Sequence, residues 1–312
     1  MNAAILSLQA QLERERQERQ EAEIKRLQYE REHMLRMIMM GRASFDGEES
    51  VRFTADSHQC CGSTVHGRLA DRATRLAVIV CHPWGPLGGS MHDPTVVSIV
   101  SLMTEAGLTT LRFSFRSGIG RGHSSAADLR AACAMLRSLD TPPEALLLVG
   151  YSYGSLVVAD VAPTLPDVAA FAMVAPPFGF ERALFLGRSV SASAQQSAKP
   201  KLACIGSDDQ FCSPELFDAF SKSLRPPCTS HCVRGETLPC NDHDHECGHA
   251  HREMVDHFSL RMHLDPILRA WLEHTFGCPF EQLAACDGVP VRGDKGLRSV
   301  PEGELSDASV VD

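Results

Sequence analysis

Short apolar runs alternate with stretches of helical periodicity from residue 51 to residue 276. Continuous apolar runs predict buried strands at 76–81, 109–115, 145–149, 169–174, 201–205 and 230–233. Apolar residues at helical spacing predict helices at 94–106, 128–138, 215–224 and 265–276. Two alternating segments, 51–55 and 64–69, predict a hairpin at the edge of the sheet. Because strands that alternate with helices form parallel sheets, we expect an α/β domain over 51–276, with a mostly parallel sheet and helices on both faces.

The pattern changes on both sides of this domain. Residues 3–40 contain neither Pro nor Gly and are rich in good helix formers, which predicts one long charged helix over 1–42. Between 13 and 23 only Ala22 is apolar, so two interpretations stay open: a solvated helix, or a coiled coil that self-associates or binds a partner through 3–40. Residues 43–50 predict a polar linker. Residues 277–312 lack apolar periodicity and predict a disordered tail.

Composition narrows the classes of function. A formal net charge of −9 argues against a general nucleic-acid binder, which needs a basic surface. No apolar run approaches the roughly 18 residues of a membrane-spanning helix, and the apolar start at 3–8 is too short for a secretion signal. Most of the 12 cysteines are scattered through apolar runs, as expected of buried thiols. We therefore expect a soluble, cytoplasmic protein without a membrane span.

A break in the apolar segment 145–157 carries the clearest chemical signal. Its sequence, Gly150-Tyr151-Ser152-Tyr153-Gly154, has the G-x-S-x-G pattern. In this pattern two glycines let the chain turn sharply from a strand into a helix and expose the serine hydroxyl. A lone serine is a weak nucleophile, so Ser152 needs a general base, and the base needs an orienting acid.

Candidates for both partners follow later in the chain. In folds with such an elbow, the acid precedes the histidine. Asp208 and Asp209 come directly after a predicted strand, and we prefer Asp209 as the acid. His257 precedes the last predicted helix and is the preferred base, with His249 and His251 as alternatives.

An attack by Ser152 also creates an oxyanion, which needs two hydrogen-bond donors. We expect one donor to be the backbone N–H of Tyr153. The other should come from the loop that follows the predicted strand 76–81, with Trp84 as the first choice and Leu87 as the second.

Several motifs along 51–276 occur in an order that resembles the small α/β-hydrolases related to dienelactone hydrolases. They are His82-Pro83 with Gly88-Gly89-Ser90-Met91, Leu111-Arg112-Phe113-Ser114-Phe115-Arg116, the elbow at 150–154, Gly206-Ser207-Asp208-Asp209-Gln210-Phe211 and Asp256-His257-Phe258. The resemblance implies an α/β-hydrolase fold, a triad of Ser152, Asp209 and His257, and an esterase-like activity. Trp84-Gly85 and residues 117–120 depart from the family pattern, which indicates a different acyl pocket.

A Cys/His-rich insertion at 228–253 is a further departure. Its metal-ligand candidates are Cys240, His243, His245, Cys247, His249 and His251. Thiolates and imidazoles at this density suit zinc, but their spacing matches no paired C-x-x-C frame, so a polar loop without metal is the alternative. We predict no cofactor.

These features together predict a serine hydrolase that cleaves a carboxylic ester or thioester through an acyl-enzyme on Ser152. The substrate would be a small molecule or an acyl group. In the alternative interpretation, the protein has no catalytic activity, its N-terminal helix binds a partner, and the hydrolase-like body serves as a scaffold. Only residues 176–199 separate two predicted strands, which leaves room for a small cap at most.

Overall fold

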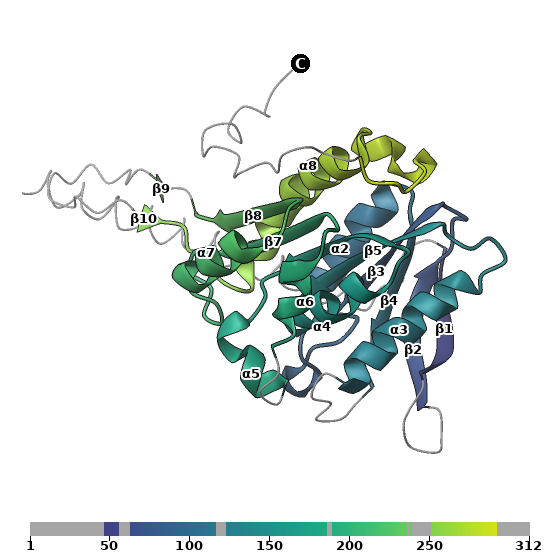
Figure 1. Ribbon diagram of the computed structural model, residues 1–312, viewed down its shortest axis with the longest axis horizontal. Helices are drawn as coiled ribbons and strands as arrows, with labels where there is room; N and C mark the ends of the chain where they lie inside the picture. Colours follow the sequence, from purple (N-terminus) through teal and green to yellow (C-terminus); the bar gives the residue numbers. More distant parts are fainter. Residues whose placement is uncertain are drawn as a thin grey trace, which may run out of the picture. The chain divides into compact units, whose positions relative to one another are not determined.

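The computed structural model describes residues 47–55, 63–116, 123–185, 189–235, 237–238 and 251–291. The helix predicted for 1–42, and the predicted tail from 292 onward, lie outside these residues. Eight strands form one sheet in the order β1-β2-β4-β3-β5-β6-β7-β8 (Figure 1). Their bounds are β1 Glu48–Ala55, β2 Ser63–Ala70, β3 Leu76–Cys81, β4 Thr109–Ser114, β5 Ala145–Tyr151, β6 Val168–Val174, β7 Lys201–Gly206 and β8 Cys228–Val233. All neighbours from β4 to β8 are parallel, whereas β2 is antiparallel to both β1 and β4, so the mostly parallel sheet is confirmed.

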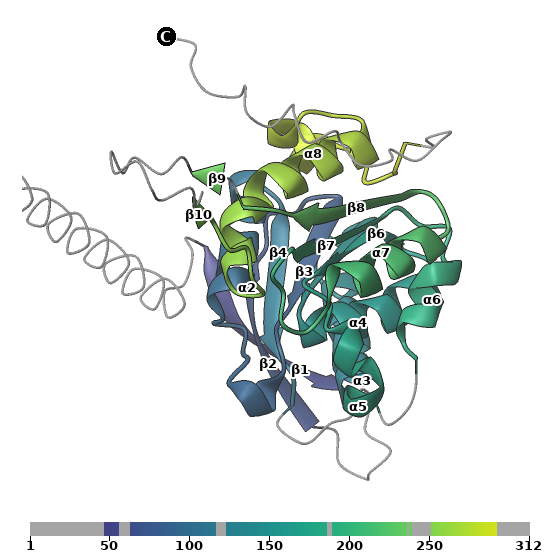
Figure 2. The ribbon, with the colours of Figure 1, turned by 90° about the vertical axis from the view of Figure 1, so that its left-hand side faces the viewer.

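Helices cover both faces of this sheet, as Figures 1 and 2 show. Their bounds are α2 Pro94–Glu105, α3 His123–Arg137, α4 Tyr153–Val161, α5 Glu181–Leu184, α6 Ser191–Gln196, α7 Pro214–Ser223 and α8 Leu264–Phe276. An apolar core lies between each helix layer and the sheet, and β3 contributes to both cores because its side chains alternate between the two faces. Ala77 and Ile79 pack on the side of α3, α4 and α7, and Val78 and Val80 pack on the side of α2 and α8.

Shorter elements complete the described chain. They are the 3₁₀ turns η1 Gly85–Leu87, η2 Ala162–Thr164, η3 Phe178–Phe180, η4 Ser259–His263 and η5 Phe280–Ala285, and the strand pair β9 Thr237–Leu238 and β10 His251–Arg252. Between β6 and β7 the described residues contain only η3, α5 and α6, which are all short. This agrees with the small cap predicted from the spacing of the strands.

The first strand begins inside the linker that the sequence predicts at 43–50, so that boundary is wrong. Glu48 belongs to β1, and its two carboxylate oxygens each accept a hydrogen bond of 2.7 Å from Arg112 of β4. Both side chains are buried. A buried bidentate ion pair with a partner 64 residues away holds these polar residues in the sheet, although their local sequence resembles a linker.

The prediction of a disordered tail over 277–312 is wrong for residues 277–291. Phe280 and Leu283 of η5 are buried and join the core on the α8 side of the sheet. Beyond them, the backbone N–H of Val291 donates to the carbonyl of Thr275 at 2.8 Å. Two apolar side chains therefore anchor a segment that has no regular apolar period.

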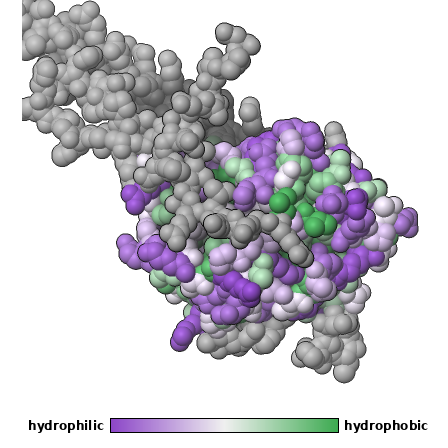
Figure 3. Space-filling view, turned by 45° about the horizontal axis from the view of Figure 1, so that its top comes forward, coloured by the Kyte–Doolittle hydropathy of each residue, from purple (hydrophilic) through white to green (hydrophobic). Residues whose placement is uncertain are grey.

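The surface on the α8 side is mixed in character. Figure 3 shows a small apolar patch there among mainly hydrophilic residues. Two exposed apolar side chains, Val289 and Val291, follow η5 in the chain. Among the described residues, no helix combines the length and the apolar character that crossing a bilayer requires.

Candidate active site

Ser152 occupies the sharp turn between β5 and α4. Its backbone has φ 53° and ψ −122°, a strained conformation for a residue with a side chain. At each of the two flanking glycines, another part of the backbone lies too close to leave room for a side chain. A Cβ on Gly150 would lie 2.3 Å from the carbonyl oxygen of Gly154, and one on Gly154 would lie 2.6 Å from that of Cys81. The glycines thus permit a tight turn at Ser152, directly beside the end of β3.

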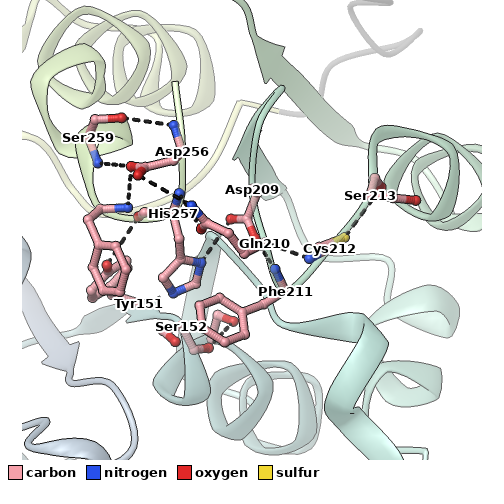
Figure 4. Close-up of polar contacts among 12 residues, drawn as sticks. Tyr151, Ser152, Asp209, Gln210, Phe211, Cys212, Ser213, Asp256, His257 and Ser259 are labelled. Atoms are coloured by element: carbon pink, nitrogen blue, oxygen red, sulfur yellow. Dashed lines mark hydrogen bonds and ion pairs between the residues drawn. The ribbon is translucent and has the colours of Figure 1, made fainter. Parts of the chain in front are cut away.

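His257 and Asp209 meet at the same end of the sheet. His257 Nδ1 lies 2.8 Å from Asp209 Oδ2, and the two side chains are 3% and 0% exposed. The other carboxylate oxygen accepts the backbone N–H groups of Phe211 and Cys212 at 2.8 and 3.0 Å. Since an ionised carboxylate only accepts hydrogen bonds, Nδ1 is the nitrogen that donates, and in the neutral imidazole the lone pair is then on Nε2. Figure 4 shows the side of the ring opposite Asp209 turned toward Ser152.

The segment that carries His257 is held by three consecutive residues after β7. Asp208 accepts the backbone N–H of Val255 at 3.0 Å, Asp209 binds the imidazole, and Gln210 Oε1 lies 3.4 Å from the backbone N of His257. The carboxylate that faces the ring is therefore that of Asp209. Asp208, the alternative acid, anchors the backbone just before the histidine.

Three aromatic rings, those of Tyr151, Phe211 and Phe258, pack against the imidazole. Tyr151 lies with its ring centroid 5.4 Å from that of His257, and its hydroxyl donates to the carbonyl of His257 at 3.2 Å. Burial raises the pKa of Tyr151, so its hydroxyl stays protonated and remains a donor. Phe211 approaches the ring edge-on at 4.6 Å. The histidine thus has a fixed orientation.

The loop after β3 is the candidate source of the second oxyanion donor. Leu87 N–H already donates to the carbonyl of Trp84 at 3.1 Å, which closes the turn of η1. No acceptor in the described part of the chain takes the backbone N–H of Trp84. Tyr153 begins α4, so its N–H lies at the positive end of that helix. Within the described residues the N–H of Leu87 is thus already engaged and that of Trp84 is not, so Trp84 stays the first candidate for the second donor.

His82 ties this loop to the neighbouring strand. Its Nε2 accepts the backbone N–H of Phe115 at 2.8 Å, so the proton is on Nδ1, which donates to the carbonyl of Pro83 at 2.5 Å. Burial lowers the pKa of His82 to about 4, although the bond to Pro83 opposes this shift. The side chain is therefore neutral near pH 7 and acts as a structural link between the ends of β3 and β4.

Comparisons with solved structures agree with this arrangement. An esterase from Pyrococcus furiosus superposes with a TM-score of 0.56 at 15% identity, over 72% of this chain and 93% of that chain. An α/β serine hydrolase homologue from Coxiella burnetii gives 0.55 at 23% identity, over 70% and 97%. A Xanthomonas campestris protein, described as an α/β serine hydrolase without lid, gives 0.54 at 24% identity, over 72% and 94%. The domain has the α/β-hydrolase fold.

Sequence comparisons add less to the α/β-hydrolase assignment. No family model matches the chain. An uncharacterized protein of Rickettsia prowazekii is 26% identical over 122 residues, which cover 36% of this chain and 51% of that protein. The match thus spans only about half of that relative. The structural neighbours confirm the fold that the ordered motifs predicted. The ordered domain is longer than the predicted range of 51–276, because β1 begins at Glu48 and η5 follows α8.

The structure describes none of the side chains of the candidate metal ligands. Cys240, His243, His245, Cys247 and His249 lie outside the described residues, and of His251 only the backbone, in β10, is described. Across the described ranges, no group of three or more His, Cys, Asp or Glu side chains could hold a metal ion.

The sequence did not show which residues hold His257 in place: Gln210 and Tyr151 were not among the candidates, and Asp208 was named only as an alternative acid. Asp208 and Gln210 flank the preferred acid, and Tyr151 precedes the serine, so all three were adjacent to predicted site residues. Their contacts join β5, the loop after β7 and the segment at 255–257. Only the fold brings these three segments together, and no local pattern could have shown it.

Proposed function

We propose that this protein is a serine hydrolase that cleaves a carboxylic ester or thioester through an acyl-enzyme on Ser152. The main support is the buried hydrogen bond between Asp209 and His257 at the end of the sheet that carries the strained elbow of Ser152. Nucleophilic acyl transfer requires a serine at such an elbow, an imidazole to take its proton and a carboxylate to orient the imidazole. Structural neighbours that include an esterase and two serine hydrolases add support.

In the acylation step, Ser152 Oγ attacks the carbonyl carbon while His257 Nε2 takes the hydroxyl proton. The oxyanion then accepts hydrogen bonds from the N–H groups of Tyr153 and Trp84. As the intermediate collapses, the bond to the leaving alcohol or thiol breaks, and His257 returns the proton to the departing atom. The product of this step is an ester of Ser152.

In the deacylation step, His257 takes a proton from water, and the resulting hydroxide attacks the acyl carbon. Ser152 leaves with the proton from His257, and a carboxylic acid is released. Asp209 stays ionised throughout and stabilises the imidazolium. Its hydrogen bonds from Phe211 and Cys212 fix the direction of the carboxylate.

Hydrolysis of butyl butyrate, followed by titration of the released acid, tests this function. Ser152→Ala should lower kcat by at least about 10³-fold, because the nucleophile is lost. Ser138→Ala is the matched control, since Ser138 is exposed and bonds only locally, to the carbonyl of Met135. A folded Ser152→Ala protein with wild-type activity would overturn the proposal.

A further inference from the structure

Large apolar side chains gather at the end of the sheet that holds the candidate active site. Among the described residues, six exposed ones lie on segments at the carboxyl ends of the strands: Leu87, Phe180, Leu216, Met254, Phe258 and Met262. Val289 and Val291 are also exposed, but they follow Gly288, which approaches Leu76 and Ala145 at the opposite end of β3 and β5. Single exposed apolar residues are normal on a protein surface, whereas a cluster beside a reactive group indicates a binding surface.

Three phenylalanines connect this apolar surface to the general base. The ring centroids of Phe180 and Phe211 are 5.7 Å apart, those of Phe211 and His257 are 4.6 Å apart, and those of His257 and Phe258 are 5.3 Å apart. Phe180 is 49% exposed and Phe258 is 62% exposed. Figure 4 shows the ring of Phe211 beside His257. A continuous row of aromatic rings thus runs past the imidazole and opens to solvent at both ends.

The exposed side chains around His257 belong to an ordered turn. Asp256 Oδ1 accepts the backbone N–H groups of Phe258 and Ser259 at 3.0 and 2.7 Å, and Ser259 Oγ donates to the carbonyl of Met254 at 3.3 Å. Leu260 is fully buried and anchors the turn. The carboxylate of Asp256 is thereby occupied, by the turn through Oδ1 and by Gln210 Nε2 at 3.3 Å through Oδ2. Met254 and Phe258 are thus exposed on a turn whose backbone is already fixed.

The position of this surface indicates which part of a substrate it contacts. His257 Nε2 must lie within hydrogen-bond distance of the leaving atom to give it a proton. Side chains that pack against the imidazole therefore border the leaving group, whereas the oxyanion donors border the carbonyl oxygen. We propose that Phe180, Phe211 and Phe258 bind an apolar leaving group, so that the preferred substrates are esters or thioesters of apolar alcohols or thiols. This inference rests on the proposed serine hydrolase function.

Two ester series test the inference in the full-length protein. The first keeps the butyrate and lengthens the alcohol from butyl to octyl, and the second keeps the butyl alcohol and lengthens the acid. Alcohols from butanol to octanol have nearly the same chemical reactivity, so a change in rate reports binding. Complete burial of one methylene corresponds to about fourfold in kcat/KM, and contact on one side to about twofold. We expect about a 16-fold rise from butyl to octyl in the alcohol series, and a smaller rise in the acid series.

Variants assign the effect to the aromatic row. Phe258→Ala should reduce the ratio of kcat/KM between the octyl and the butyl ester to about fourfold or less. Phe258→Leu keeps an apolar side chain and should therefore retain most of the wild-type ratio. Val289→Ala removes an equally exposed apolar side chain at the far end of the sheet and should leave the ratio at its wild-type value.

The outcomes separate this inference from the proposed function. Cleavage that depends on Ser152 but shows no increase with alcohol length, or a steeper increase with acid length, would overturn the inference alone. An equal loss of the ratio in Val289→Ala and Phe258→Ala would also overturn it. If no ester is cleaved, or if cleavage survives Ser152→Ala, the proposed function fails and the inference fails with it.

Discussion

Lowering the pH should charge His82 and weaken the link between the loop after β3 and the end of β4. In the folded protein Nε2 accepts the N–H of Phe115, and burial lowers the pKa of His82 to about 4. In the unfolded chain an ordinary histidine titrates near pH 6.5. Between these values the unfolded state binds more protons than the folded state, so the free energy of unfolding falls as the pH falls.

The size of this effect follows from the two pKa values. Proton linkage predicts that His82 makes its full contribution to the free energy of unfolding above about pH 6.5. This contribution is smaller by about 2 kcal/mol at pH 5 and by about 3 kcal/mol at pH 4. Other groups titrate in this range as well. His82→Gln serves as the reference, because its amide oxygen can accept the N–H of Phe115 but does not titrate.

Denaturant unfolding at pH 7, 6, 5 and 4.5 measures this difference. We expect the stability of wild type relative to His82→Gln to fall by about 2 kcal/mol between pH 7 and pH 5. If the two proteins lose stability in parallel over this range, His82 is not the buried neutral acceptor described above.

Three further substitutions test the site and the boundaries of the domain. Asp209→Asn should lower kcat by about 10³- to 10⁴-fold with a smaller change in KM, because the amide no longer holds the Nδ1–H tautomer of the base; an undiminished kcat in steady-state kinetics would contradict this role. Glu48→Gln should reduce the free energy of unfolding by about 3–5 kcal/mol, because it leaves the guanidinium of Arg112 buried without its counter-ion, and replacing both residues with Met should recover most of the loss in the same denaturation assay. Phe280→Ala should cost about 3–5 kcal/mol as a cavity forms beside α8, and an unchanged unfolding midpoint would show that 277–291 does not contribute to the core.

The central strands and the elbow could be predicted because their signals are local. Strand β5 is a continuous apolar run, and Gly150 and Gly154 mark the close approaches that the turn requires. The start of β1 could not be predicted, because Glu48 is held by Arg112, which is distant in sequence. The segment after α8 was missed for a related reason: Phe280 and Leu283 anchor it without forming a regular apolar period.

The choices among neighbouring site candidates also depended on the fold. Asp208 and Asp209 both follow β7, and the sequence favoured Asp209 as the acid but did not show that Asp208 anchors the backbone of a distant segment. Their roles differ because Asp209 faces the imidazole of His257, whereas Asp208 accepts the backbone N–H of Val255. These contacts depend on how the loop after β7 packs against the segment at 255–257, which the order of residues along the chain does not show.

The most direct test of the account is to find where a fluorophosphonate attaches to the purified protein. The reagent reacts with an activated serine, and mass spectrometry of the intact protein and of its peptides counts the adducts and locates them. We predict one adduct per chain, on Ser152, and none in a folded His257→Ala variant. An adduct on another residue, or no adduct on the folded wild-type protein, would contradict the assignment of Ser152 as the nucleophile.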